Sequence, residues 1–411
     1  TLSEYFRAEN RTQPSFERDT PLHVLPTDAP AEVKLARELL MDHAVRLSQL
    51  ISGPSEYLWR TIVGCQYAEC LKWLNHFKIF ELVPLDGNVS YSEISEKAHV
   101  LEDRLKTIAR MAMTSGLFAE PRPGYIAHSA TSAALQSNQD LKVQLNWYTK
   151  ILMPTLASTP AAHEKWAAGT APNETPFNLA FQTDLSGYEY ISRTAEMQAS
   201  FGQLMEALAR DPKNSLDHLA NSFEWANLGK ATVVDIGGNV GHVSIELASR
   251  FPRLNFVVQD RAEVAAEGEQ QMRLGNLNAS IADRIKFQGH DFFTEQPVKR
   301  AGVYLLRQIL HNWNSDDCVR ILSRIVPAMG PNSHLLVAEF VLPKPGNMLS
   351  VEERFFRLYD INMMVLFNAM ERDLAAWEGI LQRADRRLKV KAVSRPLGSS
   401  YSLIDVMLEE Q

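Results

Sequence analysis

A glycine-rich segment near the middle of the chain has the residue types that bring a backbone close to a ligand. Residues 235–241 read DIGGNVG and continue a short apolar run, ATVV. Glycine permits close approach of a ligand, and Gly241 permits the next helix to pack against the preceding strand. A dinucleotide fingerprint has the spacing G-x-G-x-x-G, whereas the spacing here is G-G-x-x-G. Because the carboxylate of Asp235 would repel a pyrophosphate, the segment predicts a cationic or amine-bearing ligand.

Two further acidic residues stand at the ends of the next two β-rich runs. Asp260 ends NFVVQD, and Asp291 ends RIKFQGHD and is followed by Phe292. A carboxylate at the end of the second strand can accept hydrogen bonds from both hydroxyls of a ribose. An acid beside an aromatic ring can hold the amine and the face of an adenine. A nucleoside with an amino-acid tail and no phosphate fits all three acids, which predicts S-adenosylmethionine (SAM) as cofactor.

The elements that would position these acids alternate between strands and helices after Lys230. Five β-rich runs, ATVVDIG, NFVVQD, RIKFQGHD, GVYLLRQIL and SHLLVAEFVL, are separated mostly by helical patterns. This alternation predicts a doubly wound, mostly parallel sheet covered by helices on both faces. Two last runs, LKVKAVSRP and SSYSLIDVMLEE, are joined by a turn so short that the strands must be antiparallel. The expected fold class is therefore α/β, with seven strands, and its ligands bind at the carboxyl ends of the strands.

The chain before Lys230 has mainly helical patterns. Val33, Ala36, Leu40, Ala44, Leu47 and Ile51 recur at helical spacing, and Gly53-Pro54 ends that run. Residues 56–80 are apolar on several sides, which predicts burial in a core or against a second copy of the chain.

Residues 90–130 predict a helix, a turn, a second helix and a hairpin, which is a winged-helix arrangement. Two interpretations stay open. The second helix could present Arg104, Lys106 and Arg110 to DNA, or the arrangement could be structural and serve dimerisation. The mostly apolar remainder of that helix and the negative charge of the chain favour the second interpretation.

Composition limits the class of protein. The 411 residues include 42 Lys+Arg and 49 Asp+Glu, a net charge of −7, which argues against a general nucleic-acid binder. No apolar stretch reaches the ~18 residues of a membrane span, and the start of the chain lacks the layout of a secretory signal. Cys65, Cys70 and Cys318 form neither a disulfide framework nor a zinc motif. A cytoplasmic protein is expected.

Four segments resemble the successive motifs of class I SAM-dependent O-methyltransferases, above all those acting on plant phenolics and fungal polyketides. They are VVDIGGNVGHVSIELASRFP, FVVQDR, GHDFF and LLRQILHNWNSDDCVRILSRIVPAM. The resemblance covers nearly the whole chain. It implies an all-helical and winged-helix dimerisation domain over residues 1–145 and a Rossmann-like methyltransferase domain over residues 146–411. It also implies a homodimer with a small-molecule substrate and neither a nucleic-acid nor a membrane partner.

The resemblance assigns residues to each part of the cofactor. These are Asp235, Gly237 and Gly238 for the amino-acid tail, Asp260 with Arg261 for the ribose, and Asp291 and Phe292 for the adenine. Arg307 stands where relatives often have a lysine near the cofactor. Asn239 stands where relatives often have a glycine, a tolerated departure because Asn accepts left-handed backbone geometry.

His311 is the candidate general base. The motif LRQILHNW places it at the end of the fourth strand, at the mouth of the cofactor cleft. A phenol has a pKa of ~10 and is only about 0.1% ionised at pH 7. An imidazole that takes its proton as the methyl arrives would accelerate transfer by ~10²–10⁴. Glu339 and Glu371 match the family positions that flank this histidine, and both are expected to orient it.

The resemblance places the substrate pocket under the helices of residues 146–206 and 352–370. Methionines and flat aromatic rings suit a planar polyketide or phenol, although core packing explains each of them equally well. The candidates are Trp147, Met153, Phe177, Phe181, Met205, Asn362, Met363 and Phe367. His128 either edges the pocket, contacts a partner subunit or is structural. The scattered histidines, without HxxxH or CxxC, predict no metal.

The sequence is compatible with three functions. The leading hypothesis is a SAM-dependent O-methyltransferase that methylates a phenolic or enolic hydroxyl of a secondary metabolite, with His311 as general base. The second is a methyltransferase-like pericyclase or dehydratase of fungal natural-product biosynthesis, which binds SAM without transferring its methyl group. Arg307, and Asn312 where many relatives have Asp, keep it open. The third is a winged-helix transcription regulator with a vestigial methyltransferase domain.

Overall fold

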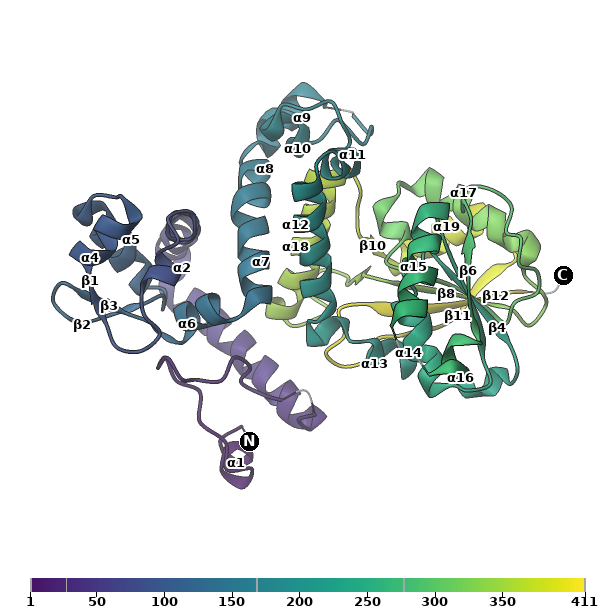
Figure 1. Ribbon diagram of the computed structural model, residues 1–411, viewed down its shortest axis with the longest axis horizontal. Helices are drawn as coiled ribbons and strands as arrows, with labels where there is room; N and C mark the ends of the chain where they lie inside the picture. Colours follow the sequence, from purple (N-terminus) through teal and green to yellow (C-terminus); the bar gives the residue numbers. More distant parts are fainter. Residues whose placement is uncertain (1, 27, 168, 276–277, 410–411) are drawn as a thin grey trace. The chain divides into compact units, whose positions relative to one another are not determined.

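The computed structural model describes residues 2–26, 28–167, 169–275 and 278–409, and the chain divides into two compact units (Figure 1). The first unit comprises Thr1–Ala167, Pro176–Leu208 and Leu349–Glu352. The second comprises Ala168–Thr175, Ala209–Met348 and Glu353–Gln411. Residues 146–167 and 176–208 thus group with the N-terminal part of the chain. Because a compact unit is not a function, the assignment of dimerisation to residues 1–145 stays a prediction.

The first unit is built mainly of helices. After α1 (Leu2–Ala8), the long α2 (Ala31–His76) crosses the unit, and its helical geometry is interrupted at Gly53, with φ of 63°. Pro54 follows, which has no N–H to continue the ladder, so the predicted break is confirmed. Besides α4 and α5, described below, this unit contains α3 (Ile79–Leu82), α6 (Ala130–Ser137), α7 (Gln139–Trp147), the π-helical η1 (Tyr148–Leu152), α8 (Met153–Ala157), α9 (Thr159–Lys165), α10 (Pro176–Phe181), α11 (Gly187–Ser192) and α12 (Ala195–Ala209).

Helices α4 (Tyr91–Ala98) and α5 (Glu102–Met113) lie beside a three-stranded sheet in the order β1-β3-β2. Its strands are β1 (Val89–Ser90), β2 (Ala119–Arg122) and β3 (Tyr125–Ala127). Two of the basic residues on α5 are engaged within the unit. Arg110 donates two hydrogen bonds to Glu120, of 2.8 and 2.9 Å, and Lys106 pairs with Glu102. This pairing weakens the case for DNA binding by α5.

The second unit holds a seven-stranded sheet in the order β11-β12-β8-β7-β4-β5-β6. Its strands are β4 (Thr232–Ile236), β5 (Asn255–Asp260), β6 (Ile285–Gly289), β7 (Val303–Arg307), β8 (His334–Glu339), β11 (Leu388–Ser394) and β12 (Ser402–Leu408). β12 is antiparallel to both β8 and β11, and the central pairs are parallel. The predicted mostly parallel seven-stranded sheet is confirmed.

Helices cover both faces of this sheet (Figure 1). Alternate residues of its strands accordingly belong to two different hydrophobic cores, one on each face. Val234 faces the core that contains α17 (Ser315–Ile325) and α19 (Leu374–Ala384). Val233 faces the core that contains α13 (Leu216–Ala220) and α14 (His242–Arg250), with α15 (Ala262–Leu274) and α16 (Ala279–Ala282) at its margin. Helix α18 (Ser350–Phe367) belongs to this unit from Glu353 on. The parallel pair β9 (Val341–Leu342) and β10 (Arg372–Asp373) also lies in it. Within the described ranges, no helix is long and apolar enough to cross a membrane.

Candidate active site

The loop between β4 and α14 lies at the carboxyl edge of the sheet and is held there by the neighbouring strand. The backbone N–H groups of Gly237 and Gly238 both donate to the carbonyl of Gln259, at 2.8 and 3.0 Å. Gly237 has a φ of 72°, in the left-handed region. A Cβ at Gly238 would lie 2.7 Å from Cγ of Asp235 and 2.8 Å from Cγ1 of Val258, so a side chain has no room there.

Asp235 supports this loop from inside the protein. Its side chain is 2% exposed, and its Oδ2 accepts a hydrogen bond of 2.7 Å from the hydroxyl of Ser244 on α14. Burial raises the pKa of Asp235 to about 6, against the opposing effects of Ser244 and Arg307. The structure thus gives Asp235 a bond that ties β4 to α14. Its predicted contact with the amino-acid tail of SAM stays a prediction.

Asp260, at the end of β5, joins the glycine loop to the next strand. Its Oδ2 accepts from the backbone N–H of Asn239 at 3.0 Å, and its Oδ1 accepts from that of Arg261 at 2.8 Å. Each carboxylate oxygen has a second lone pair, which leaves capacity for a ribose hydroxyl. The exposed guanidinium of Arg261 pairs with Glu263, so this residue contributes to the site through its backbone N–H.

Asp291 and Phe292 follow β6 in a turn that a buried amide pair steadies. Oδ1 of Asp291 accepts from the N–H of Phe293 at 3.0 Å, and the Phe292 ring lies edge-on to Trp313 with centroids 5.8 Å apart. The side chains of Gln259 and Gln296 exchange two hydrogen bonds of 2.8 Å, which tie β5 to the segment after Asp291. Sequence reasoning missed this pair, because glutamines carry no motif.

Arg307 is the last residue of β7. Its guanidinium carbon lies 5.1 Å from the ring centroid of Tyr401, a buried residue that sequence reasoning also missed. Its Nη2 donates a long bond of 3.4 Å to the carbonyl of Asn214, and among the described residues its buried Nε has no partner. The arginine charge is thus held at the carboxyl end of β7, and its Nε can still donate a hydrogen bond.

His311 lies in the 3₁₀ turn η4 (Leu310–Asn312), four residues beyond the end of β7. The predicted position at the strand end itself is therefore slightly wrong. Nδ1 of His311 lies 3.0 Å from Oε1 of Glu371, and the two side chains are 14% and 0% exposed. An ionised carboxylate can only accept a hydrogen bond, so Nδ1 carries the proton and Nε2 is the basic nitrogen. No described residue forms a hydrogen bond with that Nε2.

Glu339, at the end of β8, holds the backbone of the same turn. Its Oε1 accepts from the N–H groups of Ile309, Leu310 and His311, at 2.9, 2.7 and 3.4 Å. The sequence treats Glu339 and Glu371 as equivalent orienting groups. The structure separates them: Glu371 bonds to the imidazole ring, and Glu339 bonds to the chain that carries it.

The two acids set the charge of this cluster. Burial lowers the pKa of His311, but the carboxylates of Glu339 and Glu371 outweigh burial and raise it above its ordinary value. Burial has the opposite effect on an acid and raises the pKa of Glu339 to about 7. Among the described residues, Oε2 of Glu339 and Oε2 of Glu371 are buried without a hydrogen-bond partner. The site therefore favours an imidazolium once His311 has taken a proton.

Comparison with known proteins decides the family. The sequence matches the model of the O-methyltransferase domain over residues 165–386. O-methyltransferase bik3 of Gibberella fujikuroi is 53% identical over 408 residues, which span 99% of this chain and 90% of that protein. The chain belongs to the SAM-dependent O-methyltransferase family.

Solved structures support the fold of the methyltransferase. OxaC in complex with S-adenosylhomocysteine (SAH) and oxaline has a TM-score of 0.73 at 22% identity, over 94% of this chain and 95% of that chain. A chain described as a pericyclic reaction enzyme has a TM-score of 0.72 at 21% identity, over 91% and 94%. Identities this low show the shared fold alone, and they confirm the predicted Rossmann-like class.

The residues at the carboxyl edge of the sheet fit the cofactor of this methyltransferase family, SAM. The glycine loop packs so tightly on Asp235, Val258 and Ile309 that only glycines fit at residues 237 and 238. Asp260 keeps lone pairs for two hydroxyls, and Phe292 offers an aromatic surface beside Asp291. The donors and acceptors along this edge are those that a nucleoside without phosphate requires.

His128 of the methyltransferase is a hydrogen-bonded core residue of the first unit. It is 6% exposed, its Nδ1 lies 2.9 Å from the hydroxyl of Ser132, and its Nε2 lies 3.1 Å from the carbonyl of Val83. Burial lowers its pKa. Because both ring nitrogens are used, this geometry favours the structural interpretation over contact with substrate.

The other predicted substrate residues of the methyltransferase fall in both units. In the first unit Trp147 and Phe177 are buried, Met153 and Phe181 are half-buried, and Met205 is exposed. In the second unit Met363 is buried, and Asn362 and Phe367 are half-buried. Phe177 and Phe181 pack on each other with ring centroids 4.7 Å apart, which is also ordinary core packing. Their convergence on one substrate stays a prediction.

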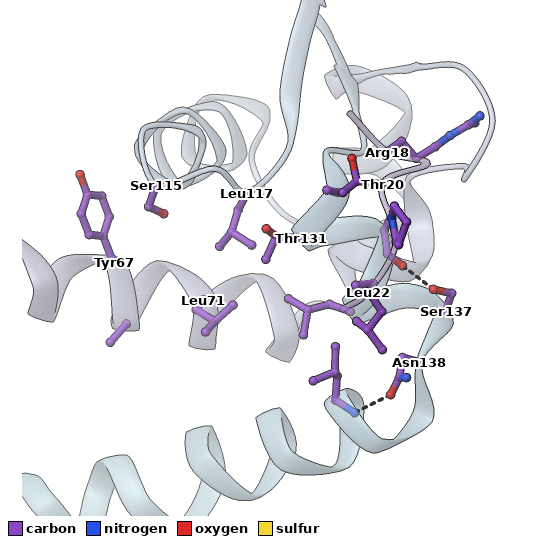
Figure 2. A pocket seen from close by; sticks show the side chains of 17 residues that line it. Arg18, Thr20, Leu22, Tyr67, Leu71, Ser115, Leu117, Thr131, Ser137 and Asn138 are labelled. Carbon is purple, nitrogen blue, oxygen red and sulfur yellow. Dashed lines mark hydrogen bonds between the residues drawn. The ribbon is translucent and has the colours of Figure 1, made fainter. Parts of the chain in front are cut away.

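A separate hollow of about 820 Å³ opens in the first unit of the methyltransferase. Figure 2 shows it between the N-terminal segment with Thr20 and Leu22, helix α2 with Tyr67 and Leu71, and the segment with Thr131 and Ser137. It includes none of the predicted site residues. Within the described part of the chain, no cluster of three His, Cys, Asp or Glu side chains could hold a metal ion.

Proposed function

We propose that this methyltransferase methylates a phenolic or enolic hydroxyl of an aromatic or polyketide secondary metabolite, with His311 as general base. The observation that carries the proposal is the bond of 3.0 Å between Nδ1 of His311 and Glu371, which leaves Nε2 as the basic nitrogen. A buried carboxylate that fixes the tautomer of an imidazole is the arrangement that general-base catalysis requires.

The reaction couples proton removal to methyl transfer. When bound, SAM would supply the methyl group from its sulfonium, the S–CH₃ bond would break as the O–CH₃ bond forms, and SAH would be the co-product. Nε2 of His311 accepts the proton of the acceptor hydroxyl as the oxygen forms its bond to the methyl carbon, so no free phenolate is needed at neutral pH. Glu371 stabilises the imidazolium that results. Asp260, Asp291 and the glycine loop would hold the cofactor in line with the acceptor, and this alignment is the protein's second contribution.

The decisive experiment supplies methyl-labelled SAM and a panel of acceptors: an anthraquinone phenol, a naphthol, a catechol and a 4-hydroxy-2-pyrone. We expect label transfer to at least one acceptor and a fall in kcat of ~10²–10⁴ in His311→Gln. The affinity for SAH should stay within about twofold of the wild type, because His311 is not in the set that holds the cofactor.

A matched control is His334→Gln. His334 also pairs with a carboxylate, Asp405, with Nδ1 and Oδ1 2.7 Å apart, but it stands at the amino end of β8, away from the carboxyl edge of the sheet. Its kcat should match the wild type. If His311→Gln kept full activity on every acceptor that the wild type methylates, His311 could not be the general base.

A methyltransferase-like pericyclase or dehydratase remains the second candidate. Arg307, whose buried Nε lacks a partner among the described residues, could polarise a substrate carbonyl at the cleft edge. The fold of a pericyclic reaction enzyme is similar, although that likeness extends to the fold alone. Tight binding of SAM without label transfer to any acceptor would favour this candidate. Retention of a specific DNA site at ~0.15 M salt would instead favour the transcription regulator.

We further propose that the methyltransferase is a homodimer formed through α2. This helix exposes an apolar series on both sides of its break, including Leu47, Leu50, Ile51, Leu58 and Trp59. Exposed apolar series of this extent mark protein interfaces. The free thiols of Cys65, Cys70 and Cys318 suit the reducing cytoplasm, which is the location we propose.

A further inference from the structure

The turn that carries His311 depends on other segments of the chain for part of its hydrogen bonding. It begins after Gln308, whose φ of 54° bends the chain off β7, and its 3₁₀ helix is only three residues long. So short a turn satisfies few of its own backbone groups, and buried backbone groups must be paired. The position of the imidazole therefore depends on the side chains that bind the backbone of residues 309–313.

Two buried side chains divide this task. Glu339 takes the N–H groups on one side of the turn. Arg372 takes the carbonyl groups: its Nη1 donates to Leu310 at 3.2 Å, and its Nη2 donates to Trp313 at 2.5 Å. The rigid guanidinium fork thus spans the turn and binds both of its ends. Cys318 adds weaker contacts from its thiol to the same two carbonyls, at 3.2 and 3.5 Å.

Arg372 is itself fixed in place. The residue is 2% exposed, and its guanidinium carbon lies 5.1 Å from the ring centroid of Trp377. In the β9–β10 ladder it stands opposite Val341, which comes two residues after Glu339. The residue before Arg372 in the chain is Glu371, which bonds to the imidazole of His311. The β9–β10 ladder therefore links three groups. Glu371 bonds to the imidazole ring, Glu339 binds N–H groups of the turn, and Arg372 binds its carbonyl groups.

We propose that Arg372 is a positioning residue for His311, because its guanidinium holds the turn that places the imidazole in the cleft. The proposal rests on the proposed function of His311 as general base. Arg372 is not among the residues proposed to contact substrate or cofactor. Its effect passes through the backbone of Leu310 and Trp313.

The charge of Arg372 gives the role a signature that a purely structural residue lacks. The charged and titratable groups around His311 are Glu339 at the end of β8, Glu371 before β10, Arg372 in β10 and Cys318 in α17, with Asp360 of α18 bound to the N–H of Glu371. Arg372 lowers the pKa of His311, against the raising effect of the two glutamates. Removing its charge leaves the imidazole among carboxylates alone, so the neutral, basic form appears only at higher pH.

Two substitutions separate geometry from charge. Arg372→Lys keeps the positive charge but loses the guanidinium whose two terminal nitrogens bind both carbonyls, so kcat should fall ~10–100-fold. The pH of the acid limb of the kcat/KM profile should not change. Arg372→Met loses both, so kcat should fall at least as far and the acid limb should move to higher pH. SAH affinity should change less than about twofold in both variants. Acceptors are the compounds that the wild type methylates in the panel above.

A matched control is Arg284→Lys. Arg284 also binds backbone carbonyls through its guanidinium, those of Leu254 at 2.8 Å and Ala248 at 2.5 Å, but beside α14 and β5. Its substitution should lower thermal stability and leave kcat and the acid limb unchanged. An NMR titration of ring-labelled histidine, with His311 assigned through His311→Gln, measures the imidazole directly. It should show a raised pKa in Arg372→Met and the wild-type value in Arg372→Lys.

The outcomes are distinguishable. Wild-type kcat and pH profile in both Arg372 variants, while His311→Gln is inactive, would overturn the proposal alone. Unaltered activity of His311→Gln would overturn the proposed base, and the NMR titration would still decide whether Arg372 sets the imidazole pKa. Loss of folding in both Arg372 variants, with Arg284→Lys folded, would assign Arg372 a structural role and would also overturn the proposal.

Discussion

At the scale of single residues, neighbouring acids of one type have different tasks because their partners differ. Glu371 meets the imidazole of His311 and Glu339 meets the backbone of the same turn. Asp260 is half-buried and accepts two backbone N–H groups, whereas Asp235 is buried against Ser244. Each difference follows from the groups that lie within hydrogen-bond distance of the acid. It has measurable consequences for titration.

Asp235 should make the folded protein less stable as pH rises through the weakly acidic range. Its pKa is raised from 3.8 to about 6 by burial, so the folded state favours the protonated form. This contribution is fully present below pH ~4 and is lost as pH rises through about 6, a change of about 3 kcal/mol. Asp235→Asn mimics the protonated acid and can still accept from Ser244.

Chemical denaturation of both proteins between pH 4 and 7, without added cofactor, tests this. The free energy of unfolding of Asp235→Asn relative to wild type should rise with pH. A difference that is flat with pH, or that falls as pH rises, would contradict the assignment of a buried, poorly solvated carboxyl group.

At the scale of elements, the cofactor edge depends on links between consecutive strand ends. The carbonyl of Gln259 in β5 fixes the loop after β4, and its side chain fixes the segment after β6 through Gln296. The loop after β7 is held from β8 and β10 in the same way, by Glu339 and Arg372. Each loop of the site is thus positioned by a strand other than its own, so local changes should act at a distance from the residue replaced.

Gly238→Ala should weaken cofactor binding. The added Cβ would lie 2.7 Å from Cγ of Asp235 and 2.8 Å from Cγ1 of Val258, so the loop must move toward the space the cofactor uses. We expect the Kd for SAH, measured by calorimetry, to rise at least about tenfold, since 1.4 kcal/mol of lost binding energy suffices. Gly379→Ala on α19 is the control, because a Cβ there meets nothing within 4 Å. Equal SAH affinity in the two variants would sink the prediction.

At the scale of the whole molecule, the chain divides into a mainly helical unit and a Rossmann-like unit, and the first unit presents an apolar series to solvent. Leu50, Ile51 and Trp59 of α2 are 79%, 73% and 65% exposed. A single chain gains nothing from such exposure, because apolar surface is stabilising only when it is removed from water. A second copy of α2 is the simplest partner that would remove it.

Light scattering tests the dimer. The wild type should have about twice the chain mass of 46.3 kDa at micromolar concentration, and Leu58→Glu with Trp59→Glu should have the mass of one chain. Leu274→Glu is the control, because Leu274 is 73% exposed on α15, outside the proposed interface. A monomeric wild type, or a dimer that survives the double substitution, would contradict an interface through α2.

The sequence predicted the sheet and its cofactor edge because both follow local rules. Apolar strands alternate with helices, and this pattern alone places Asp235, Asp260 and Asp291 at or near successive strand ends. The structure bears out the seven strands, the mostly parallel sheet and the antiparallel last pair, whereas the order of the strands comes from the structure alone. The predicted boundary at residue 145 rested on no comparable pattern. The helical patterns of residues 146–167 and 176–208 do not indicate which of the two units these helices pack in.

The tertiary structure alone decided which groups meet. Ser244 is nine residues from Asp235, Gln296 is 37 from Gln259, and Arg372 is 62 from Leu310. Glutamine and arginine side chains carry no periodic pattern, and their partners are often backbone atoms, which have no sequence identity. By itself the sequence therefore determined the family of chemistry and the strand ends where it takes place. The fold determined which acid holds the ring of His311 and which side chains hold the turn that carries it, because those contacts exist only once distant strands are packed together.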